Sequence, residues 1–173
     1  MPRTIFTIGH STRPIDEFVA ILDAHGIERL VDVRTVPRSR KNPQFNADSL
    51  PETLALKGIA WEHAPALGGL RRARRDSPNE GWRNASFRGY ADYMGTPEFR
   101  AAVDWLIETS TDKTTVIMCA EAVPWRCHRS LIADALLIRG TPVQHIMSAS
   151  KAYPHAMTSF ARVDHGAITY PPQ

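Results

Sequence analysis

Both cysteines of the chain lie in one short stretch that also carries several charged side chains. Residues 114–140 read TTVIMCAEAVPWRCHRSLIADALLIRG. A cysteine thiolate is a nucleophile at neutral pH when neighbouring positive charge lowers the pKa of the thiol. Arginine side chains bind phosphate, sulfate or carboxylate groups through two parallel hydrogen bonds. The stretch therefore predicts a nucleophilic cysteine beside a binding site for an anion.

The roles of the individual residues follow from their chemistry. Cys119 is the candidate nucleophile, and Glu121 or His128 is the candidate proton carrier. Arg126 and Arg129 are expected to bind the anionic ligand together with Arg34, and Cys127 is expected to lie near Cys119, where it could resolve an oxidised or disulfide-bonded form. A free cysteine is also among the most buried residue types, so Cys119 as a small core residue is the competing interpretation.

Metal binding by the same residues is the next alternative. Cys119, Cys127, His128 and His10 offer sulfur and nitrogen ligands, but seven residues between the cysteines match no standard zinc motif. The sequence therefore predicts no metal site and leaves any cofactor unknown. A thiol or metal sensor remains an alternative to an enzyme.

The elements around the cysteines predict a strand, a tight loop and a helix. The β-branched and apolar run at 115–118 ends at Cys119, and an amphipathic segment extends from about Arg126 to Gly140. The first N–H groups of a helix have no intrahelical partners, and the helix dipole adds positive charge there. An anion in the loop before this helix is expected to be stabilised for both reasons.

The N-terminal part predicts a βαβ unit. Residues 4–9 (TIFTIG) and 29–34 (RLVDVR) have strand patterns, and between them apolar residues recur at helical spacing from Ile15 until Gly26 ends the helix, with Ser11 or Thr12 as its cap. Polar residues follow both strands. Candidate ligand-binding residues at these two positions are Gly9, His10, Ser11, Asp32 and Arg34.

The remaining segments complete an alternating pattern. After an irregular stretch at 35–45, a short helix capped by Asn46 or Asp48 reaches 58, a strand follows at 59–63, and 64–88 is a long arginine-rich loop. Helices are predicted at 89–94 and 96–108, the second with Thr96 as its cap. A last central strand is predicted at 142–147 and an edge strand at about 167–170.

Alternating strands and helices predict an α/β fold: a three-layer sandwich with a mostly parallel central sheet and helices on both faces. We expect a single domain over 1–173, with its core at 4–147 and a C-terminal extension at 148–173. In such sheets ligands bind beyond the carboxyl ends of the strands. The motifs after the four strands are therefore expected to open on one edge, with His63 at the end of the third.

Composition and charge limit the functional classes. The chain has 173 residues, of which 43% are apolar and 23% charged, and a net charge of +3. No apolar run is long enough for a membrane span and no leader pattern is visible, so a soluble, cytoplasmic protein without a membrane partner is expected. Two arginine clusters, at 34–41 and 71–88, favour a small anionic partner, and nucleotide or nucleic-acid binding by these loops is the alternative function.

Several motifs together resemble a known family. They are the run at 7–11 (TIGHS), the run at 30–34 (LVDVR) with Pro37 and Ser39, the run at 67–69 (LGG), residues 87–94, and MCAE at 118–121 leading to CHR at 127–129. In this order they resemble the family catalogued as domain of unknown function 488, over about residues 4–147. The resemblance implies a three-layer α/β fold and a site at these motifs, but no reaction. A looser similarity is to rhodanese-like domains and cysteine phosphatases, whose arginines follow the cysteine at shorter spacing.

Overall fold

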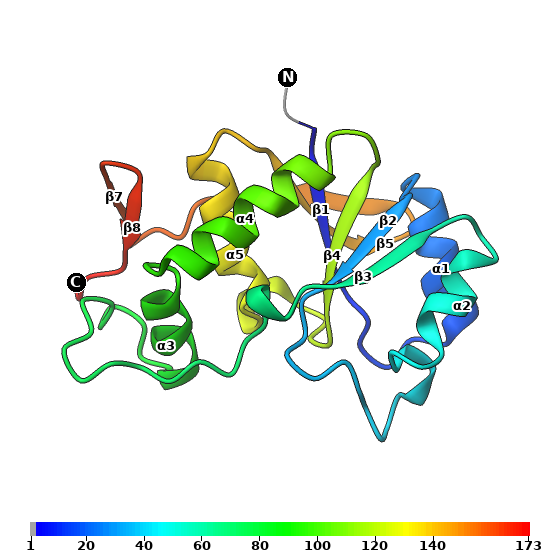
Figure 1. Cartoon of the computed structure of the whole chain (residues 1–173), viewed down its shortest axis with the longest axis horizontal. Helices are drawn as coiled ribbons and strands as arrows, with labels where there is room; N and C mark the ends of the chain where they lie inside the picture. Colours follow the sequence, from blue (N-terminus) through cyan, green and yellow to red (C-terminus); the bar gives the residue numbers. More distant parts are fainter. Residues whose placement is uncertain (1–2) are drawn as a thin grey trace.

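The central sheet is the frame that positions the cysteines. The computed structural model describes residues 3–173 and contains a six-stranded sheet in the order β3–β2–β4–β1–β5–β6 (Figure 1). Its first five strands in chain order are parallel to one another, and β6 runs antiparallel to β5. The strands are β1 (Ile5–Gly9), β2 (Arg29–Asp32), β3 (Ala60–His63), β4 (Thr115–Cys119), β5 (Val143–Ser148) and β6 (Lys151–Pro154).

Helices cover both faces of this sheet, which confirms the predicted three-layer α/β fold. On one face α1 (Ile15–Ala24) and α2 (Leu50–Ala55) pack on Ile8, Leu30 and Met118. On the other, α4 (Pro97–Thr109) and α5 (Arg129–Ile138) pack on Ile5, Val31 and Ile117. Figure 1 shows the two helix pairs on opposite sides of the strands. Successive strand residues point to opposite faces, so each strand contributes to both apolar cores.

The register of the sheet brings the predicted motifs to one edge. Gly9 at the end of β1 lies opposite Cys119 at the end of β4, and Asp32 at the end of β2 lies between Met118 and His63 on its two neighbours. The carboxyl ends of four parallel strands therefore meet at the same edge. This arrangement is the one expected for a ligand site in an open α/β sheet.

Side-chain caps explain where two helices begin. Helix α3 (Ala85–Tyr93) begins four residues before the predicted start at 89, because Oδ1 of Asn84 accepts hydrogen bonds from the N–H groups of Ser86 and Phe87. Thr96 caps α4 as predicted, with Oγ1 accepting from the N–H of Phe99. Between β3 and α3 the chain is irregular apart from one turn of 3₁₀ helix, η2 (Pro65–Leu67).

The caps predicted for α1 and α2 and the start predicted for α5 were wrong. Helix α1 follows Pro14, without a side-chain cap from Ser11 or Thr12, and Ser11 has a positive φ of 52°. Helix α2 follows Ser49, not Asn46 or Asp48, after the 3₁₀ turn η1 (Pro43–Phe45). Helix α5 begins at Arg129, because the segment from Pro124 to Arg126 forms the separate 3₁₀ turn η3 (Pro124–Arg126).

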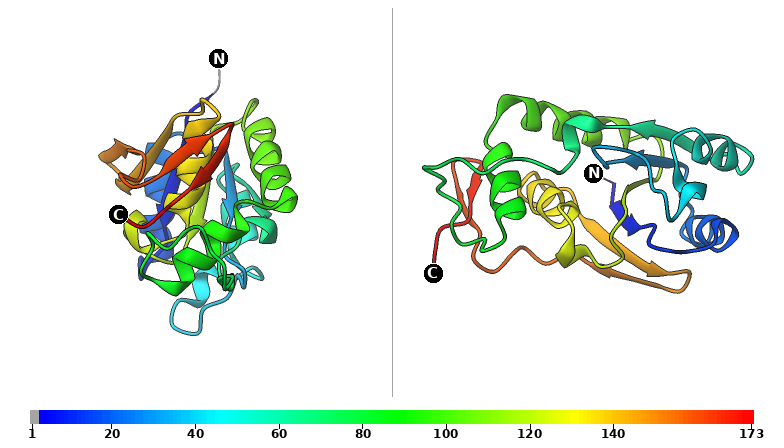
Figure 2. Two further views of the ribbon diagram at one scale, coloured as in Figure 1. Left: turned by 90° about the vertical axis from the view of Figure 1, so that its left-hand side faces the viewer. Right: turned by 90° about the horizontal axis from the view of Figure 1, so that it is seen from below.

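The C-terminal part differs from the prediction of an edge strand at 167–170. Strand β8 (Ala167–Thr169) pairs only with β7 (Arg162–Asp164) in a separate two-stranded sheet. The edge beyond β5 is taken by β6, which the sequence analysis missed, and Figure 2 shows this β5–β6 hairpin in orange. Tyr170, fully buried after β8, anchors the segment by donating its hydroxyl hydrogen to Asp134 in α5.

None of the helices within residues 3–173 combines the length and the apolar character that crossing a bilayer requires.

Candidate functional site

The two cysteines meet at the carboxyl edge of the sheet. Cys119 is the last residue of β4, and the chain then turns back through η3 so that Cys127 lies beside it, with 7.3 Å between the Cα atoms. Their sulfur atoms are joined as a disulfide. Both residues are nearly buried, with 3% and 6% of their surface exposed. The fold therefore places the two sulfurs in direct contact at this edge of the sheet.

Arg129 holds the loop that contains this pair. Its guanidinium is completely buried and donates from Nη1 to the sulfur of Cys119 over 2.7 Å and to the carbonyl of Glu121, and from Nη2 to the carbonyl of Ala122 over 3.0 Å. Nε donates to Oγ1 of Thr7 over 3.2 Å. Burial lowers the pKa of Arg129 to about 10, so the group stays cationic at neutral pH. A full positive charge thus lies against Cys119.

Cys127 has different neighbours. The backbone N–H of Arg129, in the first turn of α5, donates to its sulfur over 3.4 Å, so the positive end of the helix dipole faces Cys127. His128 has Nε2 at 2.9 Å from the carbonyl of Val33 and Nδ1 at 3.6 Å from the Cys127 sulfur. Because a carbonyl only accepts, Nε2 carries the ring proton. Burial lowers the pKa of His128 to about 4, so Nδ1 has a free lone pair.

Gly9 allows the loop after β4 to pass close to β1. A Cβ atom built on Gly9 would overlap the carbonyl group of Glu121 and approach the Cα atom of Ala122. The N–H groups of the next two residues, His10 and Ser11, donate to the carbonyls of Cys119 and Ala120 over 2.9 Å each. Gly9 is therefore a packing requirement of the cysteine loop.

Gly9→Ala is expected to destabilise the protein by about 1–3 kcal/mol, because the methyl group can be accommodated only by displacing backbone. The change in free energy of unfolding is measured by urea titration. Gly95→Ala is the matched control, since a Cβ there would have only the carbonyl of Asp92 near it, at 3.4 Å. Equal effects of the two substitutions would contradict the close approach at Gly9.

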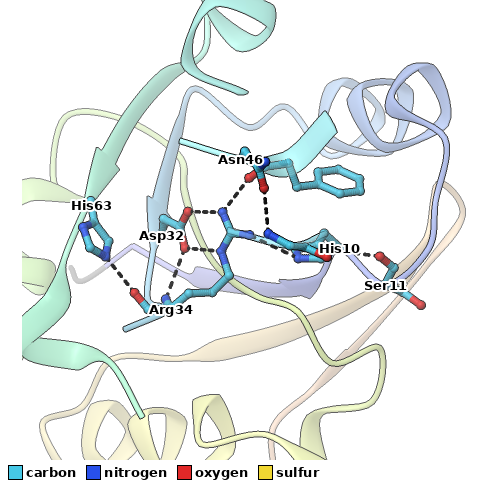
Figure 3. Close-up of polar contacts among 8 residues, drawn as sticks. His10, Ser11, Asp32, Arg34, Asn46 and His63 are labelled. Carbon is cyan, nitrogen blue, oxygen red and sulfur yellow. Dashed lines mark hydrogen bonds and ion pairs between the residues drawn. The ribbon is translucent and has the colours of Figure 1, made fainter. Parts of the chain in front are cut away.

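On the opposite face of the sheet, a buried ion pair with Asp32 fixes the side chain of Arg34. Its Nε and Nη2 donate to the two carboxylate oxygens of Asp32 over 2.9 and 2.6 Å, and Nη2 also donates to the carbonyl of Phe45. His10 stacks on the Phe45 ring and has Nδ1 at 2.8 Å from the Ser11 carbonyl (Figure 3). Burial lowers the pKa of His10 to about 4, so its Nε2 accepts from Arg34.

A cavity of about 360 Å³ opens between this buried ion pair and the cysteine pair. Its volume fits a small organic ligand rather than a bare ion. The polar part of its lining comes from two hydroxyls, three arginines, a carboxylate, an imidazole and both sulfurs: Thr35, Ser86, Arg34, Arg38, Arg126, Glu121, His128, Cys119 and Cys127. Val36, Leu70, Phe87 and Tyr90 supply apolar surface, and Val36 and Leu70 are 59% and 82% exposed at its rim.

The arginines of the cavity are not equivalent. The guanidinium of Arg34 is paired with a carboxylate that is completely buried. Arg38 and Arg126 are exposed, and within residues 3–173 neither side chain has an ion-pair or hydrogen-bond partner. Because these two charges are uncompensated by the protein, they are the ones available to an anion entering the cavity.

The structure brings together six of the residues predicted from the sequence. Those that line the cavity are Cys119, Glu121, His128, Arg34, Arg126 and Cys127. Five predicted residues lie behind its wall and support it through contacts within the protein: Gly9, His10, Ser11, Asp32 and Arg129. His63 also lies outside the lining, with Nε2 at 2.7 Å from the Arg34 carbonyl.

The sequence analysis did not assign helix α3 to the site, although three of its residues line the cavity. Tyr90 is buried, donates its hydroxyl hydrogen to the carbonyl of Leu67, and also lines the cavity. Ser86 and Phe87, in the first turn of the same helix, were assigned to a loop. The only available signal was Asn84, whose type and position favour a helix start.

Many side chains of the arginine-rich segment at 71–88 already have partners within the protein. Arg71 lies over the Tyr93 ring at 3.7 Å, Arg74 pairs with Asp76, and Arg88 donates to two backbone carbonyls. Within the described residues no three His, Cys, Asp or Glu side chains form a group that could hold a metal ion.

The fold and this edge define a class of protein: a three-layer α/β domain with a cysteine pair beside an arginine-lined cavity at the carboxyl ends of parallel strands. The chain belongs to the family described as Domain of unknown function DUF488, whose model matches residues 14–136. No curated protein and no solved structure matches the chain. The family assignment confirms the resemblance seen in the sequence and names no reaction.

Proposed function

We propose that this protein is a cysteine-dependent enzyme that reduces a small anionic disulfide bound in the cavity. The observation that carries the proposal is the joined pair of Cys119 and Cys127 in a cavity whose two exposed arginines have no partners in the described chain. Arg38 and Arg126 would hold the anionic group of the ligand. The apolar rim at Val36 and Leu70 favours a ligand that also has an apolar body.

The reaction begins from the dithiol. The thiolate of Cys119, stabilised by the buried charge of Arg129, attacks one sulfur of the ligand, so a protein–ligand S–S bond forms while the S–S bond of the ligand breaks. The first half of the ligand leaves as a thiolate. Cys127 then attacks the sulfur of Cys119, releases the second half, and forms the disulfide. Two electrons pass from the protein to the ligand, and an external thiol reduces the protein again.

Proton handling is expected at the second step. The free lone pair of His128 Nδ1 faces Cys127, so His128 is the acceptor for the proton of that thiol as Cys127 becomes a nucleophile. Glu121 has its carboxylate exposed at the cavity and its carbonyl fixed by Arg129. Glu121 remains the second candidate proton carrier.

The experiment that tests the proposal compares two aromatic disulfides, the dianionic dithiobis(nitrobenzoate) and the neutral dithiodipyridine. The quantity compared is the rate with the dianionic reagent divided by the rate with the neutral one, both measured on reduced protein. In Arg38→Ala/Arg126→Ala this ratio is expected to fall about tenfold, equivalent to about 1.4 kcal/mol. The same ratio should fall with rising salt in the wild type only. Arg72→Ala is the control, because Arg72 is exposed but does not line the cavity. A ratio unchanged by the double substitution would contradict anion binding in the cavity.

A further inference from the structure

A chain of buried polar groups extends from Arg129 away from the cavity. Thr7 Oγ1 lies 2.6 Å from His145 Nδ1, His145 Nε2 lies 2.8 Å from His155 Nδ1, and His155 Nε2 lies 2.7 Å from Asp134 Oδ1. Thr7 and Asp134 are completely buried, and the His145 residue is 2% exposed. Buried polar groups of this kind are costly unless each is paired, and here every link is paired.

The donors and acceptors of this chain can be assigned in order, starting from Asp134. Asp134 is already an acceptor for the Tyr170 hydroxyl and the Thr158 N–H, so it accepts from His155 as well. Burial, with the charge of Arg129 and the neighbouring His155, lowers the pKa of His145 to about 3, so this ring is neutral. In the tautomer of His155 that leaves Nδ1 unprotonated, His155 accepts from His145, and His145 accepts from the Thr7 hydroxyl.

Arg129 connects this chain of hydrogen bonds to the cysteine pair. With its own hydrogen donated to His145, the Thr7 oxygen is left as an acceptor, and Arg129 Nε donates to it over 3.2 Å. The chain thus links a buried cation to a buried anion through successive hydrogen bonds. It fixes the plane of the guanidinium whose Nη1 contacts the sulfur of Cys119.

We propose that Thr7, His145 and His155 are positioning residues, which hold the Arg129 guanidinium against Cys119 and so keep the Cys119 sulfur ionised in the reduced protein. The inference rests on the proposed function in one respect only, that Cys119 reacts as a thiolate. None of these three residues lies in the lining of the cavity, and none is required to touch the ligand. Their effect is transmitted through Arg129.

Other charged or titratable groups face the same guanidinium and sulfur. Tyr153 from β6 and Glu121 from the loop raise the pKa of Arg129, whereas Arg13, from the segment before α1, lowers it after the larger effect of burial. Cys127 and His128 lie on the other side of the Cys119 sulfur. Changing Thr7 alters none of these groups chemically, so a shift seen on changing Thr7 reports on the chain.

The test is the pH profile of Cys119 alkylation by iodoacetamide in the reduced, full-length protein. Trypsin cleaves after Arg126 and so places Cys119 and Cys127 in different peptides, which mass spectrometry quantifies separately. In Thr7→Val the midpoint is expected to move up by about one pH unit, which lowers the rate about tenfold at pH values well below both midpoints. The substitution replaces one neutral group by another, so its effect cannot come from a changed net charge.

Three further variants make the result specific. Thr7→Ser keeps the hydroxyl and is expected to return the midpoint to within about 0.3 pH units of the wild type. Thr115→Val removes another completely buried strand hydroxyl, at the far end of β4, and is expected to leave the midpoint unchanged. His145→Leu is expected to shift it in the same direction as Thr7→Val. Circular dichroism confirms which variants fold, and Thr7→Val compared with Thr7→Ser decides the result by itself.

The possible outcomes separate this inference from the proposed function. A low wild-type midpoint that Thr7→Val leaves unchanged would overturn the positioning role and leave the nucleophile in place. A wild-type midpoint at the ordinary thiol value of about 8.5 would overturn the thiolate at Cys119, and both proposals with it. A low midpoint that rises in Thr7→Val and returns in Thr7→Ser supports both.

Discussion

Replacing Cys119 by serine is expected to lower the rate of dithiobis(nitrobenzoate) reduction at least about 10³-fold, because the nucleophile of the first step is lost. The wild-type dithiol should release two nitrobenzoate thiolates for each protein molecule, one from each step. Cys127→Ser is the matched variant, since it removes the other member of the same sulfur pair. It should release one thiolate at an undiminished initial rate and then stop.

Stoichiometry makes this prediction sharp. In Cys127→Ser the second half of the reagent has no thiol to displace it, so it stays on the protein as a mixed disulfide with Cys119. The absorbance of the released thiolate and the mass of the protein measure the two halves separately. If Cys119→Ser instead released one thiolate as fast as the wild type, Cys127 would be the first nucleophile and the order of steps would be reversed.

Asp32→Ala is expected to reduce the free energy of unfolding by about 3–5 kcal/mol. It leaves the guanidinium of Arg34, 7% exposed, without the carboxylate that compensates its charge, and a buried charge without a partner is among the most destabilising changes known in proteins. The loss is measured by urea denaturation monitored through tryptophan fluorescence. Arg34 also lines the cavity. Because Asp32 holds its guanidinium in place, the substitution should weaken anion binding as well.

An exposed ion pair provides the control for this prediction. Arg74 and Asp76 are joined at 2.8 Å, but their side chains are 61% and 74% exposed. Water and salt screen an exposed pair of this kind, so Asp76→Ala should leave stability almost unchanged. A small effect at Asp32, comparable to that at Asp76, would mean that water reaches the Arg34 guanidinium after the substitution.

The sequence was sufficient to predict the sheet edge at which the motifs meet. The strand patterns at residues 4–9, 29–34 and 115–119 are strong, because runs of β-branched and apolar residues are bounded by polar or turn residues. The carboxyl ends of parallel neighbouring strands meet at one edge of the sheet. The contact between Cys119 and Cys127 follows from the same rule together with the short turn after β4. These features are local, and local patterns are what a sequence records most directly.

The division of the site into two faces was not predictable in the same way. Cys119 points toward the α4–α5 side and Asp32 toward the α1–α2 side, because a shift of one residue along a strand reverses the direction of a side chain. The role of Arg129 depends on acceptors from β1 and from the loop after β4, which meet only in the folded chain. Likewise, the chain from Thr7 to Asp134 joins residues more than a hundred positions apart.

The C-terminal strands show a second limit. Strand β6 has the sequence KAYP, with exposed Lys151 and a terminal proline, and it is short and polar as edge strands commonly are. Such a segment lacks the apolar alternation on which strand prediction depends. His155, directly after it, could therefore not be connected with His145 from the sequence.

The most direct test of the central claim is the rate at which reduced Cys127→Ser, whose only cysteine is Cys119, reacts with dithiobis(nitrobenzoate) at pH 7. A thiolate in an arginine-lined cavity predicts a second-order rate about tenfold or more above that of a free thiol with an ordinary pKa, declining as salt is added. A rate below that of the free thiol and insensitive to salt would contradict the claim, because it is the behaviour of a cysteine that is simply buried in the core.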